Sequence, residues 1–518
     1  MADIRPKDDS GKENLECEYT HKPDYEIPYG TLPSEEWSCT HPPIDEHDGE
    51  ELCIFHLPVD KKSESDVRER LTQCVNMEGK DNKRFIGAEI PSLDLVNQTI
   101  NSEDNYPIDF RDTTIDGDVL LDGSSVNQKL LFTGAEIRGE ISAEGTQFHE
   151  QFFARLTSIK EGVKFTDANF YNLANFRNAS IGSPANFRGC DFYHDANFYG
   201  CEFNVEESDH NKPGGRPLLI NFSESTFSNG ANFNNVVFND VPYFRRVSCD
   251  GVFLLNSIRL NGKEYTYASS DSDIYSEDGW RGNIVCRIRG GEFEELRLSY
   301  ECSVDDPCVV SITDSEIQEG ILAQPEERCV YLNISGTTLG DVALKNIDSA
   351  EKWKHLIIRN TDFNGFDFTD YHSSLEDLNF DIYAINNPTG FEWFSEYDIQ
   401  TKEMTFLKAR IGADTIRDYR ASSEFHIHEL DTRRVRLWRE KRYTQYLAHL
   451  IWGESSQYGE KPARVMIVFV PLLVAAYLLA NSQPVSGTVS TFFGFLLILL
   501  PPIFSALLVL SSSRYIGN

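Results

Sequence analysis

An 11-residue period runs through the middle of this chain, and it constrains the fold more than any other feature of the sequence. One series of positions 11 apart runs from Phe110 to Phe198, and a second series, offset by five, runs from Ile115 to Phe203. Sixteen of these 18 positions carry a large apolar residue. Apolar positions that alternate at spacings of five and six residues match neither the period of a helix nor that of a simple strand. They predict a coil of short straight segments.

The residue two places before each marked position adds a second constraint. Before every member of the second series it is small: Thr, Ser, Ala or Cys. The first series contains two alanines, Ala143 and Ala154, and these follow the large residues Ile141 and Phe152. Within each pair, the large residue compensates for the small one, so the total side-chain volume is kept, as a close-packed interior requires.

Four faces per coil satisfy this pattern, with one large and one small side chain from each face pointing inward. Two faces take 11 residues, so a full coil takes 22. Stacked coils would hydrogen-bond at about 4.8 Å, as strands do, around a column of phenylalanines. The pattern starts near Phe85 and continues with looser faces to about Phe368. We therefore expect a mainly β chain with a β-helix over residues 84–370, and insertions at 205–217 and 261–283.

Five segments of the repeat share an Ala-Asn-Phe core. They are Ala168-Asn-Phe170, Ala174-Asn-Phe176, Ala185-Asn-Phe187, Ala196-Asn-Phe198 and Ala231-Asn-Phe233. This core matches the motif A-[DN]-[LF]-x-x, so the chain resembles the pentapeptide-repeat family, strongly over residues 110–260 and more weakly to about residue 370. The resemblance implies a right-handed quadrilateral β-helix. Spacings of five and six depart from the family's strict fives, which implies wider turns at some corners.

Residues 15–60 form a head rich in cysteine and histidine. Its candidate ligands are Cys17, His21, Cys39, His41, Cys53 and His56. Structural zinc takes four such ligands in a tetrahedron, often with a paired spacing like Cys53-x2-His56. With Cys17 and Cys39 this pair would make a Cys3His zinc site, with His21 or His41 as substitute ligands. The region has few aliphatic residues, so a metal would explain how it folds. The alternative is ordinary thiols and surface histidines in a flexible lead-in.

The carboxyl end has a different physical character. No charged residue occurs from Val465 to Ser513. Two apolar stretches, 463–480 and 489–510, are each close to the roughly 20 residues that cross a bilayer. They predict two transmembrane helices in a hairpin over 463–511. The alternative is a buried helical hairpin in a soluble core.

Basic residues precede the first apolar stretch. Eight basic and three acidic residues lie between Arg433 and Arg464, and such positive charge stays on the cytoplasmic side of a membrane. We therefore expect both the amino-terminal part and the carboxyl terminus on the cytoplasmic side of the cytoplasmic membrane. The junction Tyr458–Arg464 also resembles membrane-anchored pentapeptide-repeat proteins. Residues 491–495 lack the second glycine of a carbonyl-lined pore filter, so the hairpin is interpreted as an anchor.

A connector over 371–460, largely helical from residue 402, joins the two regions. Helical spacing predicts one helix from Phe406 to Arg420 and another from Arg433 to Leu450. Aromatic residues among the arginines, such as Trp438 and Tyr443, suit the headgroup zone of a bilayer. The equally weighted alternative is a helix pair that caps the open end of the β-helix. Residues 1–14 are expected to be flexible.

The charge and cysteine content of the chain argue against some classes of function. The chain has 82 acidic and 48 basic residues and a formal charge of −34, which repels nucleic-acid phosphates. Such acidity also suits a halophilic source. Eleven cysteines in 518 residues, with no apolar signal region at the amino end, indicate reduced thiols in a cytoplasmic compartment.

No catalytic constellation or phosphate-binding loop stands out, so the chain is not expected to be an enzyme. The first hypothesis is a membrane-tethered scaffold that binds an unidentified protein partner, either as a monomer or as a homo-oligomer. The second is an acidic mimic of duplex DNA that binds a DNA topoisomerase, as the resemblance implies for some family members. The third is a subunit of an ion channel or sensor.

Overall fold

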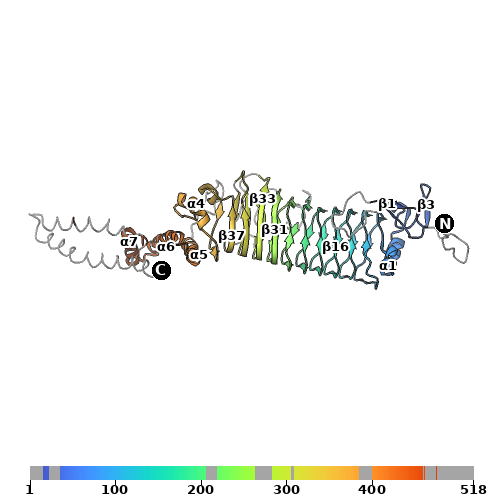
Figure 1. The fold of residues 1–518 in the computed structure, drawn as a ribbon, viewed down its shortest axis with the longest axis horizontal. Helices are drawn as coiled ribbons and strands as arrows, with labels where there is room; N and C mark the ends of the chain where they lie inside the picture. The colour runs from blue at the N-terminus through green and yellow to red at the C-terminus, as the bar shows by residue number, and fades with distance from the viewer. Residues whose placement is uncertain are drawn as a thin grey trace, which may run out of the picture. The chain divides into compact units, whose positions relative to one another are not determined.

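The computed structural model describes residues 16–22, 36–205, 219–262, 283–304, 308–328, 330–383, 399–458, 460 and 474. The chain forms two compact units, Met1–Asn333 with Ala343–Asn346, and Ile334–Val342 with Ile347–Asn518. The first unit carries a β-solenoid with a small head at its amino end, and the second ends in helices (Figure 1). The predicted mainly β solenoid and helical region are therefore confirmed.

Several predicted features lie outside the described residues. They are the flexible segment 1–14, most of the insertions at 205–217 and 261–283, and the apolar stretches 463–480 and 489–510 apart from Val474. In the part of the chain that the structure describes, no helix combines the length and the apolar character needed to cross a membrane. The right hand of the solenoid stays a prediction.

Each coil of the solenoid has four faces. Each two-residue strand between Glu89 and Asn221 pairs in parallel with the fourth strand after it, so that Val119 lies opposite Ile141 and Val126 opposite Phe148. The step between these partners is the 22-residue coil that the sequence predicts. The pairing therefore places residues 22 apart directly above one another.

Most strands of the first unit belong to one of four faces. The first face comprises β6 (Leu93–Asp94), β10 (Val119–Leu120), β14 (Ile141–Ser142), β18 (Val163–Lys164), β22 (Ala185–Asn186), β26 (Ile220–Asn221), β30 (Pro242–Arg245), β32 (Asn283–Arg289), β34 (Cys308–Thr313) and β36 (Tyr331–Asn333). The second comprises β7 (Thr99–Ile100), β11 (Ser125–Val126), β15 (Gln147–Phe148), β19 (Asn169–Phe170), β23 (Asp191–Phe192) and β27 (Thr226–Phe227). The third comprises β8 (Ile108–Asp109), β12 (Leu130–Leu131), β16 (Phe152–Phe153), β20 (Ala174–Asn175), β24 (Ala196–Asn197) and β28 (Ala231–Asn232). The fourth comprises β5 (Glu89–Ile90), β9 (Thr114–Ile115), β13 (Glu136–Ile137), β17 (Ser158–Ile159), β21 (Ser180–Ile181), β25 (Glu202–Phe203) and β29 (Val237–Phe238).

Aromatic rings fill the interior in columns. The ring centroids of Phe176 and Phe198 are 4.9 Å apart, and those of Phe198 and Phe233 are 4.7 Å apart. The small residues of the repeat bond the backbone of the coil before them. Cys201 Sγ donates to the Phe176 carbonyl at 2.8 Å, and Ser225 Oγ donates to the Phe187 carbonyl at 2.7 Å. Small size and a donor group together explain why Ser, Thr and Cys occur at this position.

One turn residue per 11 has a left-handed backbone conformation. These residues have φ between 54° and 76° and are Asp112, Gly123, Gly134, Gly145, Leu156, Asp167, Asn178, Gly189 and Gly200. Glycine, Asn and Asp enter this region with the least strain. Leu156 is the exception, and its side chain is exposed.

From Ser248 onward, one long strand replaces three short ones in each coil. β31 (Ser248–Leu260) pairs with β27, β28 and β29, and then with β33 (Glu292–Cys302). β33 pairs in turn with β35 (Glu316–Ala323). The register shifts where the former corners lie, so β31 bends there instead of breaking. The sequence predicts looser faces here, but not continuous strands.

The head contains two small hairpins and a helix. β1 (Thr20–His21) pairs antiparallel with β2 (Trp37–Ser38), and β3 (Asp45–His47) with β4 (Glu50–Leu52). The 3-10 turns η1 (Val59–Lys61) and η2 (Lys80–Lys83) flank α1 (Glu64–Asn76). The head lies on the first coil, because the Glu89 N–H donates to the Phe55 carbonyl at 2.9 Å and the Phe55 ring packs edge-on against Phe85.

The elements after Asn333 belong to the second unit, apart from Ala343–Lys345 at the end of the first strand named next. They are β37 (Thr338–Lys345), α3 (Ala350–Trp353), β38 (Leu356–Ile357), β39 (Asp362–Phe363), η4 (Thr369–Tyr371), α4 (His372–Asp377), α5 (Ile399–Thr415), α6 (Tyr419–Arg439) and α7 (Tyr443–Ser456). α5 covers β39: Lys408 Nζ lies 2.8 Å from an Asp362 carboxylate oxygen, and a Cβ on Gly412 would lie 2.3 Å from the Phe363 carbonyl oxygen.

The predicted helix boundaries are wrong in two places. Helix α5 ends before Arg417, whose φ is 65°, and α6 starts at a cap in which the Asp418 carboxylate accepts from the Ala421 N–H at 3.1 Å. The helix predicted as continuous from Arg433 to Leu450 breaks at Lys441, whose φ is 59°. The spacing of apolar residues does not indicate either break, because each break depends on one residue with a left-handed backbone conformation.

Candidate metal centre

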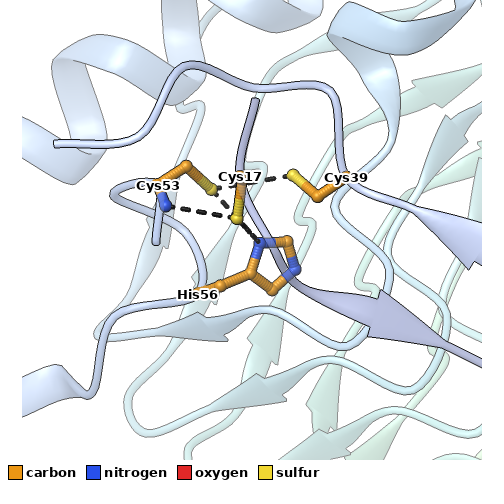
Figure 2. Close-up of side chains that lie close together, drawn as sticks. All are labelled: Cys17, Cys39, Cys53 and His56. Atoms are coloured by element: carbon orange, nitrogen blue, oxygen red, sulfur yellow. Dashed lines mark hydrogen bonds between the residues drawn. The ribbon is translucent and has the colours of Figure 1, made fainter. Parts of the chain in front are cut away.

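Four side chains of the head, three at the ends of strands and one in a turn, lie close together. Cys17 precedes β1, and its N–H donates to the His41 carbonyl at 3.1 Å. Cys39 follows β2, and its N–H donates to the Tyr19 carbonyl at 2.9 Å. Cys53 follows β4 and begins a tight turn in which the His56 N–H donates back to the Cys53 carbonyl at 3.0 Å. Figure 2 shows the four side chains of Cys17, Cys39, Cys53 and His56 facing one another.

The four ligand atoms fit a tetrahedral ion. They all lie within 4.8 Å of one another, and all four residues are buried. Cys39 Sγ lies 3.8 Å from Cys53 Sγ, and His56 Nδ1 lies 3.2 Å from Cys53 Sγ and 3.8 Å from Cys17 Sγ. With Zn–S near 2.3 Å and Zn–N near 2.0–2.1 Å, a tetrahedron has edges of about 3.8 Å between sulfurs and about 3.5 Å between sulfur and nitrogen. The spacing therefore suits zinc without rearrangement of the backbone.

The imidazole of His56 is held from its other side. His56 Nε2 lies 3.0 Å from the Ile86 carbonyl oxygen, to which it donates, so the lone pair is on Nδ1, facing the thiols. The Tyr19 ring stacks on the imidazole with centroids 3.9 Å apart. A hydrogen bond from the second ring nitrogen is the usual way to orient a metal-binding histidine. Neither contact has a sequence signal, because one uses a backbone carbonyl and the other a single aromatic residue.

The three thiols do not share one protonation state. Hydrogen bonds from Cys39 and Cys53, and from the Cys53 N–H at 3.3 Å, favour the thiolate of Cys17 and lower its pKa well below the usual range. Hydrogen bonding to Cys17 and burial raise the pKa of Cys53 to about 12 and that of Cys39 well above its usual range. Without a cation, hydrogen bonding within the centre therefore favours the thiolate at Cys17 and the protonated thiol at Cys39 and Cys53. A divalent ion would displace both of those protons.

The two substitute histidines have other contacts. His21 Nε2 lies 2.7 Å from an Asp112 carboxylate oxygen. His41 Nε2 lies 3.1 Å from the Arg84 carbonyl oxygen, and its ring stacks on Phe85. Both histidines thus link the head to the first coils of the solenoid instead of joining the four-residue cluster.

The comparisons with known proteins support the solenoid. A family model described as pentapeptide repeats (9 copies) matches residues 157–205. No curated protein and no solved structure matches the chain.

Proposed function

We propose that this chain is a non-enzymatic, membrane-tethered scaffold that binds a protein partner on the cytoplasmic side, with a zinc-held head at its amino end. The solenoid is the observation that carries the proposal. Parallel strands fix outward side chains at regular intervals on flat faces, and residues 157–205 match a repeat found in such solenoids. A rigid, ordered surface loses little entropy on binding, which favours protein recognition.

A charged hollow on the solenoid is the surface that we propose for a partner. It has a volume of about 820 Å³, and Arg138, Glu140 and Lys164 are among its lining residues. Arg138 Nη1 lies 2.6 Å from Asp116 Oδ1, and Lys164 Nζ lies 2.8 Å from Glu140 Oε2. Because these ion pairs are half-exposed, they contribute more to the orientation and choice of a partner than to the stability of the fold.

Zinc in the head would act structurally. The ion would tie the ends of β1, β2 and β4 to the turn at His56, whose Nε2 donates to Ile86 at the start of the solenoid. A solenoid needs a cap because its terminal coil otherwise exposes unpaired strand edges. A zinc-held head supplies that cap where the region has too few aliphatic residues to fold by itself.

Exposed apolar residues on α7 support the membrane part of the proposal. Tyr443, Leu447 and Ile451 recur every four residues and are each about half exposed, as is Trp438 at the end of α6. The exposed basic residue Arg439 ends α6, and the exposed Lys441 and Arg442 lie between α6 and α7. An apolar stripe beside basic residues suits the interface of an anionic bilayer. The uncharged stretch from 465 to 513 begins nine residues after the end of α7.

The connector has two interpretations, a cap on the β-helix and a segment in the headgroup zone of a bilayer, and these thus apply to different helices. α5 contacts β39 and covers the end of the strand stack in its own unit, whereas α7 leaves its apolar stripe exposed. We infer that α5 and α6 act as a cap and that α7 lies at the headgroups. The two apolar stretches would then anchor the chain, as the sequence predicts.

Crosslinking in cells, at the organism's own salt, followed by purification from membranes tests this function. The double variant Arg138→Glu/Lys164→Glu should lose the crosslinked partner but remain in the membrane fraction. Arg188→Glu/Arg259→Glu is the matched control, because both residues are exposed, ion-paired and outside the hollow. Equal recovery with all three proteins would contradict the assignment of the hollow. Recovery of a topoisomerase would favour the DNA mimic, and current across a planar bilayer would favour a channel.

A further inference from the structure

Two thiols outside the metal centre lie close together at a corner of the solenoid. Cys302 is the last residue of β33 and Cys308 is the first residue of β34. Their Sγ atoms are 3.0 Å apart. A disulfide needs about 2.05 Å, so a shift of about 1 Å would bring the two sulfurs to bonding distance. We propose that Cys302 and Cys308 form a reversible disulfide and are a thiol-modification site of this protein.

The two thiols differ in their access to solvent. Cys302 is partly exposed and lines a hollow of about 490 Å³, together with Ser257, Gln324 and Arg328. Cys308 is fully buried. A small oxidant therefore reaches Cys302 first, and Cys308 is placed to react with it in a second step.

The oxidant that fits this arrangement is a low-molecular-weight disulfide of the glutathione type. The Cys302 thiolate attacks one sulfur of that disulfide, the sulfur–sulfur bond breaks, and one small thiol leaves with the proton of Cys302. Cys308 then loses its proton and attacks Cys302 Sγ, and the second small thiol leaves with that proton. Two protein thiols are oxidised to one disulfide, and one small disulfide is reduced to two thiols.

Other cysteines of the described chain are less suited to this reaction. Cys190 and Cys201 are fully buried, and their thiols donate to the carbonyls of Phe165 and Phe176. Cys286 is also fully buried. In the metal centre a bound ion would protect the thiolates. Cys302 and Cys308 combine a reachable sulfur with a neighbouring one.

The bond would tie the end of β33 to the start of β34 on the wall of the hollow. Arg328 Nη1 donates to the Cys302 carbonyl at 3.1 Å on the same wall, and the Tyr300 hydroxyl donates to Gln324 Oε1 at 3.4 Å. Oxidation would fix this wall covalently. The surface that the solenoid presents there would then depend on the thiol–disulfide balance of its surroundings.

Peptide mapping of the full, zinc-loaded chain tests the inference. After incubation with oxidised glutathione, wild-type protein should lose two titratable thiols and give a peptide pair linked through Cys302 and Cys308, which dithiothreitol reverses. Cys308→Ala should keep one glutathione on Cys302, and Cys302→Ala should give neither product. Cys329 is the next cysteine along the sequence, so Cys329→Ser is the matched control and should still form the link.

Three results would overturn the inference. They are wild-type protein that keeps all its thiols, a link that joins Cys302 to Cys329, and Cys308→Ala protein without glutathione on Cys302. Thermal unfolding of each variant in reductant, compared with wild type, separates loss of the reaction from loss of the fold. If Cys308→Ala is unfolded, the wild-type peptide map alone decides.

Discussion

The rings of Phe152 and Phe176 lie 5.3 Å apart in the interior, although the two residues occupy different positions of the repeat. One coil before Phe176 in its column, the repeat has Ala154, which is fully buried. Phe152 fills the space beside that alanine, with its ring centroid 6.1 Å from Phe132 on the other side. The sequence predicts that Phe152 compensates in volume for Ala154. In the structure, the Phe152 ring indeed occupies the space that a large side chain at position 154 would fill.

A double-mutant cycle tests this compensation. Phe152→Ala leaves a cavity and should cost about 3–5 kcal/mol, and Ala154→Phe overfills the same space and should cost about 1–3 kcal/mol or more. The double variant Phe152→Ala/Ala154→Phe restores the usual small–large order and should recover most of the loss. Denaturant unfolding of the solenoid measures all three. A double variant no more stable than Phe152→Ala would contradict the packing described here.

Leu156→Gly should stabilise the solenoid. Leu156 has φ 56°, a conformation that costs a leucine about 1–2 kcal/mol, and its side chain is 42% exposed, so little burial is lost. Glycine loses more backbone entropy on folding, which reduces the net gain to roughly 0.5–1 kcal/mol. Thermal unfolding measures it, with Gly145→Leu as the reciprocal variant that should destabilise. An unchanged or lower midpoint for Leu156→Gly would show that the corner is not strained.

Zinc affinity should rise with pH. The pKa of Cys53 is raised to about 12 and that of Cys39 is also raised, whereas that of Cys17 is lowered. Near neutral pH the metal-free centre therefore holds two thiol protons that zinc displaces. The apparent affinity should increase about 100-fold per pH unit between about pH 6 and 8, which competition with a chelator measures. A flat profile would contradict release of these protons.

The metal-free head should show the opposite trend. Because the pKa values of Cys39 and Cys53 are raised in the folded state, the stability that these two thiols confer is present below the unfolded thiol pKa of about 8.5 and is lost as the pH rises above it. Chelator-treated protein should therefore lose head stability in alkaline solution, where zinc-loaded protein does not. Hydrogen exchange of the head at two pH values distinguishes the two forms.

Trp438 should lie at the membrane interface. It is 55% exposed next to the apolar stripe of α7. In vesicles of anionic lipid, brominated acyl chains should quench part of the tryptophan fluorescence, and Trp438→Phe should remove that part. Trp353→Phe is the matched control, since the Trp353 indole is buried and donates to Ser374 Oγ at 2.9 Å. Quenching that is unchanged by Trp438→Phe would place α7 away from the bilayer.

The solenoid could be predicted because its constraint is local and repeated. Each coil must place a large and a small side chain inward on each face, so the 11-residue period is visible without knowledge of the fold. The left-handed corner residues share this period. The long strands from Ser248 onward could not be predicted, since whether a corner bends or breaks depends on the strand stacked against it.

The four-residue cluster of Cys17, Cys39, Cys53 and His56 could be predicted in part. Cys53 and His56 are three residues apart, so one turn joins them, and the sequence indicates the pair directly. The sequence also favours Cys17 and Cys39 as the other two ligands, but it leaves His21 and His41 open as substitutes. His21 reaches Asp112 and His41 reaches the Arg84 carbonyl, and both contacts cross distances that sequence spacing does not encode.

The most direct test of the metal centre is the zinc content of purified full-length protein, measured by elemental analysis beside two variants. Cys53→Ser removes one candidate ligand. Cys201→Ser removes a thiol whose place in other coils is filled by Ser124 and Ser225, so the fold should be kept. We expect one zinc per chain in wild-type and Cys201→Ser protein and little in Cys53→Ser. Equal zinc in all three, or none in wild type, would contradict a Cys3His site at Cys17, Cys39, Cys53 and His56.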